Sequence, residues 1–389
     1  PDLQKQLVAV NSVADLKVTP VMRPGNTPGK LEAELKVEDQ LPLHSSIELN
    51  NHASPNTSEF RLAGMVRYDN LWQRAHSLSL QAQIAPKKIS EVKVLSGTYL
   101  MPLVNSDNQL AIYGVISRSN VATIGEMSVM GKGNILGARL AMPLPSREKF
   151  FHSATLGADY KHFLDAEQLA GTNTGKPPMS YLPFSLGYSV NMPDETGMSA
   201  ANATLNFHLR GIGDRKIDCS GQVISEFECK RYHAKPDYFY LRGGVERTRN
   251  LPKGMVMFAK LDGQLASGPL ISNEQFTAGG ADSVRGYLES EQAGDDGMHV
   301  TMELRGPQWA RGKFSDLRAV VFVEAAHLRV REALSGQTDS FNLASTGLGL
   351  RTQLGKSFTL GVDVAVPLKS TTFTQADKVR VGFKAVGTF

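Results

Sequence analysis

The segment Met298-His299-Val300-Thr301-Met302-Glu303-Leu304-Arg305 alternates strictly between apolar and polar side chains. A β-strand points successive side chains to opposite faces, so such a segment has one apolar face and one polar face. Residues 358–366 follow the same rule, with a large apolar side chain at every second position. The pattern predicts strands that separate an apolar environment from a polar one.

Comparable alternation occurs at residues 239–248, 255–265 and 317–325, and it continues from about residue 43 to the last residue. Helical spacing of apolar residues is not sustained anywhere in this region. We count roughly 16 such segments, and an even number of antiparallel strands is typical of a closed single-chain barrel in a bacterial outer membrane. We therefore predict an all-β fold, a 16-stranded antiparallel transmembrane β-barrel in the lipid bilayer of the outer membrane.

The connections between these segments fall into two alternating classes. Short turns occupy residues 105–108, 145–148, 192–195 and 355–356, whereas longer loops occupy roughly residues 118–132, 164–177, 211–235, 267–296 and 367–377. Short periplasmic turns that alternate with longer extracellular loops are typical of outer-membrane barrels. A soluble β-sandwich would also alternate its side chains, but it has no reason to sort its loops in this way.

Composition agrees with a barrel and excludes other classes. The 389 residues are 41% hydrophobic with a mean hydropathy of -0.21, and lipid-facing and lumen-facing residues average to such a value. The longest apolar runs, such as residues 320–323, are far shorter than the ~20 residues of a transmembrane helix. A net charge of only +4 gives no reason to expect a nucleic-acid partner.

No motif indicates catalysis, a cofactor or a metal site. Gly131-Lys132-Gly133 and Gly347-Leu348-Gly349 do not lead into helices, as a phosphate-binding loop requires, and strand glycine is the better interpretation. The sequence has no Gly-x-Ser-x-Gly elbow and no His-x-x-x-His pair. We interpret the inward-facing charged residues as ordinary lumen lining: Arg242, Glu246, Lys260, Asp262, Glu303 and Arg305.

Cys219 and Cys229 lie in a polar, glycine-containing stretch. An even number of cysteines that pairs within one loop suits an oxidising compartment, so we predict a disulfide between them. Two unrelated free thiols are the alternative. A zinc site is a weaker one, because these two cysteines lack the closely spaced pairs that zinc sites use.

The first forty residues follow a different pattern. Residues 3–13 can form a short helix, and residues 15–22 and 31–37 read as two strands joined by a Pro-Gly-rich turn. Because one helix and two strands make only a small core, residues 1–40 are predicted to be the C-terminal remainder of a larger domain. No signal peptide precedes Pro1, so it was either removed or lies upstream of this sequence.

The final strand alternates up to a terminal phenylalanine, with Phe383 and Phe389 on the same face. This resembles the C-terminal signature of outer-membrane barrels, which the barrel assembly machinery recognises. The resemblance implies that Phe389 and Phe383 form an assembly signal and that this machinery is a partner during biogenesis.

Residues 271–287 read Ile-Ser-Asn-Glu-Gln-Phe-Thr-Ala-Gly-Gly-Ala-Asp-Ser-Val-Arg-Gly-Tyr and lie in one of the long loops. They resemble the Val-Arg-Gly-Tyr loop of the polypeptide-transporting barrel superfamily, in the form typical of two-partner secretion transporters (the TpsB or haemolysin-activator family, ShlB/FhaC/HecB-like). The motif residues are Val284, Arg285, Gly286 and Tyr287.

Further matches to this family occur in family order. Residues 24–38 look like the end of the second periplasmic POTRA domain, and residues 41–44 and 67–72 look like the first barrel strands. The resemblance therefore covers essentially the whole chain. It implies the end of a POTRA domain in the periplasm at residues 1–40 and an outer-membrane β-barrel at residues 41–389.

By the strand count the motif lies in the sixth extracellular loop, and the resemblance implies that this loop folds back into the lumen. Gly279, Gly280 and Gly286 permit backbone conformations that a residue with a Cβ resists. An arginine carried into a restricted lumen needs a carboxylate partner, because its burial is otherwise costly.

In the family that partner lies in a Phe-x-Asp-x-Gly-like motif on the following strands. The matching segment is residues 322–326, Phe-Val-Glu-Ala-Ala, so Phe322 and Glu324 are the implied partner residues. Strand phase agrees, since the odd-numbered neighbours of Glu324 would face lipid. Glutamate in place of aspartate still allows a bidentate pair but shifts the loop tip by about one methylene. Glu303 is a competing partner, and unrelated solvated charges are the remaining alternative.

The resemblance implies a pore that exports a large unfolded exoprotein, a TpsA-like cargo, in two-partner (type V) secretion, without an enzymatic activity. A barrel insertase of the same superfamily is one alternative, and it would be favoured by a weak seam between the first and last strands. A diffusion porin for small solutes is the other, and it would not need the Val-Arg-Gly-Tyr loop.

Overall fold

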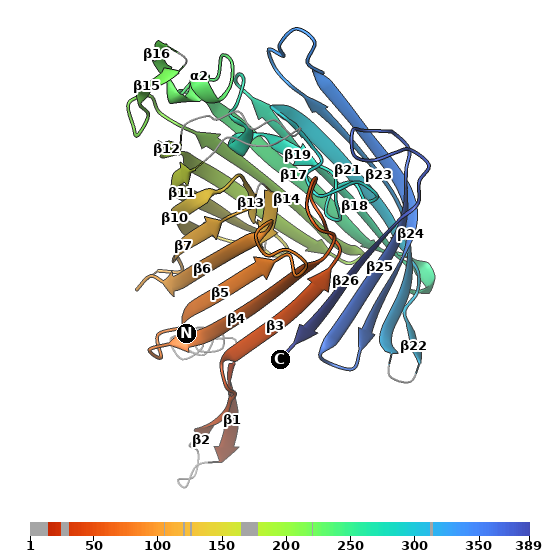
Figure 1. Ribbon diagram of the computed structural model, residues 1–389. Helices are drawn as coiled ribbons and strands as arrows, with labels where there is room; N and C mark the ends of the chain where they lie inside the picture. The colour runs from red at the N-terminus through yellow and green to blue at the C-terminus, as the bar shows by residue number, and fades with distance from the viewer. Residues whose placement is uncertain are drawn as a thin grey trace.

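The computed structural model describes residues 15–24, 31–104, 106–119, 121–124, 127–164, 178–219, 221–311 and 314–389. Its main feature is a closed barrel of antiparallel strands (Figure 1). Two strands of the wall are interrupted, between β12 and β13 and between β21 and β22, and each interrupted pair continues along the same neighbour. With each such pair taken as one strand the barrel has 16 strands, which confirms the predicted fold.

The wall strands follow one another in sequence order, and each pairs antiparallel with its neighbours. They are β3 (Leu43–Asn50), β4 (Arg61–Leu71), β5 (His76–Ile84), β6 (Lys93–Pro102), β7 (Gln109–Ser117), β10 (Gly133–Pro143), β11 (Phe151–Phe163), β12 (Met179–Tyr181) with β13 (Phe184–Asp194), β14 (Gly197–Phe207), β17 (Phe239–Asn250), β18 (Val256–Ala266), β21 (Asp296–Arg305) with β22 (Trp309–Arg311), β23 (Phe314–Arg329), β24 (Ser340–Leu354), β25 (Phe358–Pro367) and β26 (Arg380–Thr388).

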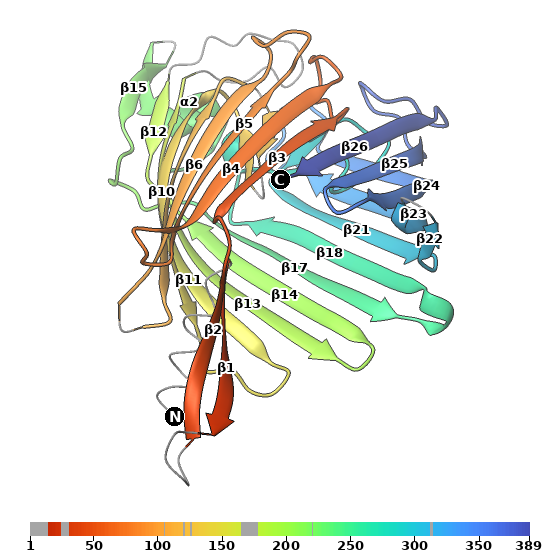
Figure 2. The same cartoon turned by 90° about the horizontal axis from the view of Figure 1, so that it is seen from below.

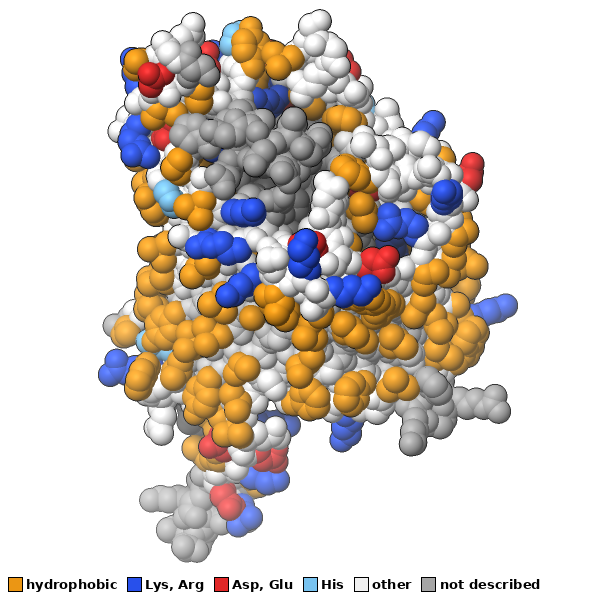
Figure 3. All heavy atoms as spheres, viewed as in Figure 1, with side chains coloured by type: hydrophobic (Ala, Val, Ile, Leu, Met, Phe, Trp, Pro, Cys, Tyr) orange, Lys and Arg blue, Asp and Glu red, His pale blue; other side chains and the backbone are white. Residues whose placement is uncertain are grey.

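Side chains alternate between the two faces of this wall as the sequence pattern predicts. In β23, Val321 and Val323 are about half exposed on the outer face, whereas Phe322 and Glu324 are 1% and 2% exposed inside. Apolar side chains cover much of the outer surface seen in Figure 3. In the described residues no helix is both long enough and apolar enough to span a bilayer.

The two ends of the barrel differ in their connections. One end carries short turns, such as residues 72–75, 195–196 and 355–357, and the other carries longer loops, such as residues 208–238, 267–295 and 330–339. The small elements are β8 (Val121–Ile124), β9 (Met127–Met130), β15 (Lys216–Cys219), β16 (Gln222–Ser225), α2 (Glu226–Lys230), η2 (Ser272–Glu274), β19 (Phe276–Ala278) and β20 (Gln292–Gly294) in the long loops, and η1 (Pro252–Gly254) in a short turn. The predicted sorting of connections is therefore present.

The barrel closes between its last and first strands. Residues 384–388 of β26 pair with residues 46–50 of β3. Ser45 and Phe389 extend this ladder by exchanging two backbone hydrogen bonds, with N···O distances of 2.9 and 2.8 Å. The terminal phenylalanine thus takes part in closing the wall through its backbone.

An antiparallel hairpin, β1 (Leu16–Pro24) with β2 (Leu31–Asp39), extends away from the barrel at the short-turn end (Figures 1 and 2). These are the two strands predicted near the N-terminus. The predicted helix at residues 3–13 and the turn at residues 25–30 lie outside the described residues. The assignment of this part to a POTRA domain stays a prediction.

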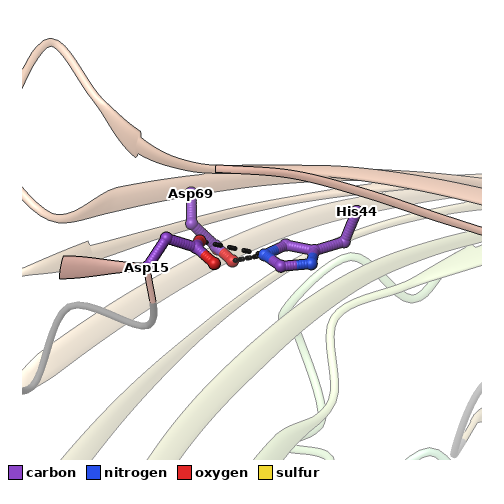
Figure 4. A group of neighbouring side chains, drawn as sticks. All are labelled: Asp15, His44 and Asp69. Atoms are coloured by element: carbon purple, nitrogen blue, oxygen red, sulfur yellow. Dashed lines mark hydrogen bonds and ion pairs between the residues drawn. The ribbon is translucent and has the colours of Figure 1, made fainter. Parts of the chain in front are cut away.

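Three side chains connect the hairpin segment to the wall (Figure 4). Nε2 of His44 on β3 lies 2.9 Å from Oδ2 of Asp15 and 3.5 Å from Oδ2 of Asp69 on β4. Asp15 also accepts a backbone hydrogen bond from Gln40, at 3.0 Å. Side-chain and backbone contacts therefore fix where the hairpin leaves the barrel.

Candidate functional site

The loop between β18 and β21, residues 267–295, is the sixth connection at the long-loop end, and its tip lies against the inner face of the wall. A small hairpin, β19 with β20, brings its two limbs together. Beyond this hairpin, Val284, Arg285 and Tyr287 are 0%, 6% and 5% exposed. The Val-Arg-Gly-Tyr motif is therefore buried inside the barrel.

Glycines shape the loop tip. Gly279 has φ of 110°, and a Cβ there would lie 2.5 Å from the backbone oxygen of Leu288. Gly286 has φ of 93° and packs against Ala365 and Pro367 of β25. Because both conditions exclude a normal side chain, the tight path of the tip depends on these residue types.

Arg285 and Glu324 form the most extensive pair at the tip. Oε1 of Glu324 accepts from Nε and Nη2 of Arg285, at 2.8 and 2.6 Å, while Oε2 accepts from the Arg285 backbone N–H at 2.6 Å. Glu324 is 2% exposed. The glutamate thus binds both the guanidinium and the backbone of the motif, so the longer side chain reaches the position that the sequence assigned to it.

Two further carboxylates surround Arg285. Nη2 lies 2.7 Å from Oε1 of Glu303 on β21, and Nη1 lies 3.5 Å from Oδ1 of Asp363 on β25. Glu303 also binds Arg305 at 2.7 Å, and Asp363 also binds Arg351 at 2.8 Å. Glu303 is therefore an additional partner and not a competitor. We call Arg285, Glu303, Glu324 and Asp363 the tip site.

Charges in this network balance, with three guanidinium groups against three carboxylates. Glu303 and Asp363 each have an arginine of their own, whereas Arg285 is the only cation bonded to Glu324 among the described residues. Burial of Arg285 disfavours its charged form, but these carboxylates outweigh that effect and raise its pKa. Glu324 is consequently the carboxylate that depends most on Arg285.

Phe322 lies beneath Arg285, with its ring centroid 3.6 Å from the guanidinium carbon. This places a cation against the face of an aromatic ring in a desolvated site. Gly347 of β24 provides the room, because a Cβ there would lie 2.4 Å from the Phe322 ring. A strand glycine outside the loop motif therefore supports the tip site.

The other motif residues attach the loop to the wall. Val284 is buried in an apolar cluster that includes Ala326 and Leu328 of β23. The Tyr287 hydroxyl lies 3.0 Å from the carbonyl oxygen of Ala344 and 2.8 Å from that of Lys369. Tyr287 thus joins the tip to β24 and to the loop between β25 and β26.

A second polar site holds the base of the loop on another sector of the wall. Glu274 accepts from Nζ of Lys161 on β11 at 2.6 Å and from the hydroxyls of Tyr181 on β12, at 2.5 Å, and Tyr240 on β17, at 2.8 Å. Glu274 is 2% exposed. Its carboxylate is therefore fully bonded despite its burial. We call these four residues the base site.

Asp295 fixes the returning limb of the loop, the part that leads from the tip back to β21, beside the base site. This fully buried carboxylate binds Arg231, with Nη2···Oδ2 at 2.6 Å, and accepts from the backbone N–H groups of Leu270 and Arg331. Gln264 of β18 donates to the backbone oxygens of Glu274 and Asp295, at 3.1 and 3.0 Å. Three neighbouring long loops thus meet at the base.

Between these sites the loop contacts two more connections at the long-loop end of the barrel. The backbone N–H of Glu289 donates to Ala53 at 2.9 Å, and Glu291 accepts from Thr374 at 2.7 Å. Burial raises the pKa of Glu289 to about 7, despite a backbone hydrogen bond from Ala281 that favours the charged form. One loop residue therefore titrates near neutral pH.

A lumen cavity of about 650 Å³ remains between the loop and the wall formed by β14, β17 and β18. Its lining includes Glu246, Lys260 and Asp262, which the sequence predicted to face the lumen. Loop residues such as Thr277 and Ser283 form its other side. The loop therefore occupies part of the lumen and leaves a polar space beside it.

The remaining predicted site residues lie away from the loop tip. Cys219 and Cys229 form a disulfide in the loop between β14 and β17. The Phe389 ring packs edge-on against Phe358, with centroids 6.0 Å apart, and the Phe383 ring lies 6.1 Å from that of Phe60. Their role as an assembly signal stays a prediction.

One group of described residues has donors close enough together to hold a metal ion, namely Asp15, His44 and Asp69, whose ligand atoms lie within 4.8 Å of one another. Arg67 already donates to Asp69 at 2.9 Å, and His44 to Asp15 at the same distance. We interpret the group as a hydrogen-bonded cluster at the root of the hairpin, because each carboxylate already has a side-chain partner.

Sequence reasoning missed Asp363, Glu274 and Asp295. Asp363 occupies a lumen-facing position of an alternating strand, so its phase could have indicated it as a partner of Arg285. Glu274 lies within the quoted stretch and Asp295 follows it, but their partners come from β11, β12, β17 and another loop. Nothing in local spacing indicates such contacts.

Comparison with known proteins gives both sequence and structural matches. A family model described as haemolysin secretion/activation protein ShlB/FhaC/HecB matches residues 225–352, a range that contains the loop and β23. The outer membrane transporter CdiB of Dickeya dadantii (strain 3937) is 21% identical over 418 residues, covering 98% of this chain and 67% of that protein.

Among solved structures, CdiB from Escherichia coli matches with a TM-score of 0.74 at 16% identity, over 100% of this chain and 70% of that one. BamA from Haemophilus ducreyi lacking POTRA domains 1-3 matches with a TM-score of 0.64 at 15% identity, over 99% and 77%. These structural matches show the fold, and the sequence matches show the likeness to the family. With its closed barrel and the Val-Arg-Gly-Tyr loop seated in the lumen, the chain is similar to the ShlB/FhaC/HecB haemolysin secretion/activation proteins and to the outer membrane transporter CdiB.

Proposed function

We propose that this barrel exports a large unfolded exoprotein through its lumen, and that the loop at residues 267–295 is the gate of the pore. The observation that carries the proposal is the attachment of Arg285 to Glu303, Glu324 and Asp363 on the inner wall. Such a network holds the loop in the path of any cargo. Displacement of the tip would widen the lumen without removing the loop from the protein.

The cargo is a TpsA-like secreted protein, and the family provides the basis for this assignment. The segment before the barrel, including residues 1–40, faces the periplasm and belongs to the capturing POTRA region. An extended cargo segment would bind there by adding a strand to an exposed sheet edge. Folding of the cargo outside the cell would supply direction without nucleotide hydrolysis.

The seam between β26 and β3 bears on the insertase alternative, because an insertase would need it to open, and its ladder joins only five residue pairs. Beyond the paired strands, the Asn51 side chain replaces backbone pairing: Nδ2 donates to the Val381 oxygen and Oδ1 accepts from the Phe383 nitrogen, both at 2.8 Å. Lys384 of β26 also binds Glu48 of β3 at 3.1 Å. Side-chain bonds therefore reinforce a short ladder.

The decisive experiment measures secretion of an N-terminal fragment of the exoprotein encoded beside this transporter. Full-length transporter and its Arg285→Ala variant are compared at equal barrel levels in the outer membrane. We expect the fragment in the medium with the unmutated transporter and a loss of at least tenfold with the variant. Lys260→Gln, a lumen change away from the tip site, is the matched control and should retain secretion.

Each outcome separates the candidate functions. Equal secretion from Arg285→Ala and the unmutated protein would contradict the role of the tip site while keeping the export function. No secretion from the unmutated protein, together with steady conductance of small ions after purification, would replace export with diffusion. Loss of other outer-membrane barrels on depletion of the chain would instead indicate an insertase.

A further inference from the structure

The base site contains a buried carboxylate with three donors, and the bonds that hold Arg285 at the tip do not require it. Glu274 is an acid on the loop, and it meets an ammonium group and two hydroxyls that three wall strands supply. Its partners are also enclosed, since Tyr181 is 0% exposed and Tyr240 5% exposed. A buried carboxylate with several donors is costly to separate from them, because each group would be left unpaired.

Apolar packing surrounds the base site and includes residues of the loop itself. Leu270 and Ile271, which precede η2, are 1% and 2% exposed and belong to one cluster with Phe163, Tyr181 and Phe227. The returning limb adds Asp295, which is bonded to Arg231 from the neighbouring loop. Both limbs are therefore fixed at the same level of the barrel.

The tip and the base are attached to separate sectors of the wall. Arg285 binds carboxylates on β21, β23 and β25, whereas Glu274 binds donors on β11, β12 and β17. None of the charged partners is shared between the two sites. Breaking one site therefore removes no bond of the other.

We infer that Glu274 is a positioning residue which keeps the base of the loop on the wall while the tip leaves its seat, so that the gate moves about a fixed base. This inference deepens the proposed gating function and rests on it. The loop then returns to the same place after each cargo, because its limbs never lose their position.

Pulsed spin-label distance measurements on the full-length protein test this inference. One label sits at Lys356→Cys in the short turn between β24 and β25, and the other at Ser272→Cys for the base or Asp282→Cys for the tip. Both native cysteines are joined in a disulfide and leave no thiol to label. We expect Arg285→Ala to broaden the Asp282 distribution at least twofold and to leave the Ser272 distribution unchanged.

Changes at the base should have the complementary effect. Glu274→Gln should broaden the Ser272 distribution, and the charge-exchanged pair Lys161→Glu with Glu274→Lys should narrow it again. Tyr240→Phe, which removes a single hydroxyl, is a milder variant should the larger changes prevent folding. Glu246→Gln changes a lumen glutamate outside both sites and should leave both distributions as they are.

The inference is overturned if Arg285→Ala broadens both distributions equally, because the loop would then move as one body. It is also overturned if Glu274→Gln leaves the Ser272 distribution unchanged. Secretion is assayed in parallel, so that the fixed base and the proposed gating function are tested separately. Distances that change as expected while every variant secretes normally would support the fixed base and refute the gating function on which it rests.

Discussion

At the tip of the loop a cation carried by the loop meets carboxylates of the wall, whereas at the base a carboxylate carried by the loop meets an ammonium group and two hydroxyls. The tip site belongs to a network with three cations and three anions, so its bonds are mutually dependent. The base site has one charge pair supplemented by neutral donors. Two attachments of one loop can therefore respond differently to the same change.

Loss of Arg285 should have the largest effect of any single change at these sites. Arg285→Ala leaves Glu324 buried without a cation, and breaking such a pair costs on the order of 3–5 kcal/mol. We expect thermal stability to fall with secretion. Adding Glu324→Gln should restore much of the stability, because the stranded charge is removed, but not secretion, because the tip remains unattached.

Measured melting temperatures of the single and double variants form the cycle that checks this prediction. Glu274→Gln with Lys161→Met is the parallel cycle at the base. A purely additive result for Arg285 and Glu324 would contradict the dependence of Glu324 on Arg285. If Glu274 and Lys161 were coupled as strongly as Arg285 and Glu324, the base and the tip would not differ in how far their bonds depend on one another.

Gly347→Ala sharpens the comparison without touching a charged residue. Its Cβ would lie 2.3 Å from the Val364 backbone oxygen and 2.4 Å from the Phe322 ring, so both the neighbouring strand and the ring beneath Arg285 must shift. Overpacking of this kind costs roughly 1–3 kcal/mol. We expect looser attachment of the tip with an unchanged base, measured as faster proteolysis within residues 279–291. Gly382→Ala, where nothing lies within 4 Å of the added Cβ, is the matched control.

How far the sequence predicts these features depends on the range of the contacts. Alternation from about residue 43 to the last residue, together with the sorting of short turns and long loops, was sufficient for the barrel. Alternation at residues 317–325 gave the inward phase of Glu324, because strand geometry is local. Residue type and family pattern together indicated Arg285 and Glu324. The base site was not predictable, since Lys161 and Glu274 are far apart in sequence and meet only through the closure of the wall.

Glu324, which replaces the family's aspartate, shows a second limit to what the sequence predicts about the tip site. The sequence predicted a tip shifted by about one methylene, which stays a prediction, and it did not indicate that the longer side chain binds the guanidinium and the Arg285 backbone at once. The family pattern indicated Phe322, but the support that Gly347 gives to its ring was hidden, because packing between neighbouring strands depends on shape. The sequence pattern therefore indicated Glu324 as a partner of Arg285. The number of hydrogen bonds between the two residues follows only from the three-dimensional structure.

A change of pH should affect the attachment of the tip half of the loop more than the attachment of the base. Glu289 has a pKa raised to about 7 by burial, so the seated loop holds a proton that the released loop loses above its ordinary value of 4.5. The equilibrium constant for seating the tip therefore falls as pH rises from about 4.5 to 7, by at most tenfold per pH unit. Above about pH 7 this constant no longer changes.

Tip distances from a label at Ala281→Cys, which keeps the Asp282 charge, measure this effect at pH 5 and pH 8, and Glu289→Gln should abolish it. Several charged groups surround Glu289, namely Asp282, Arg61, Lys384 and nearby His52. Burial lowers the pKa of His52, so its contribution has the opposite sign and is lost as pH falls below 6.5. A response that survives Glu289→Gln would assign the pH dependence to another of these groups.

The smallest expected effect on secretion concerns the disulfide beside the base. Cys229 ends the segment that leads into Arg231, whose guanidinium binds Asp295. Replacing Cys219 and Cys229 by serine releases a ten-residue connection, which costs about 2–4 kcal/mol of local stability.

Asp295 keeps its bonds to Leu270 and Arg331 in the serine variant, so the base should stay attached. We expect faster proteolysis near residues 216–230 and less than a twofold loss of secretion. A loss as large as that of Arg285→Ala would mean that the base depends on the neighbouring loop more than on Glu274, and the origin of its stability would have to be reassigned to Arg231.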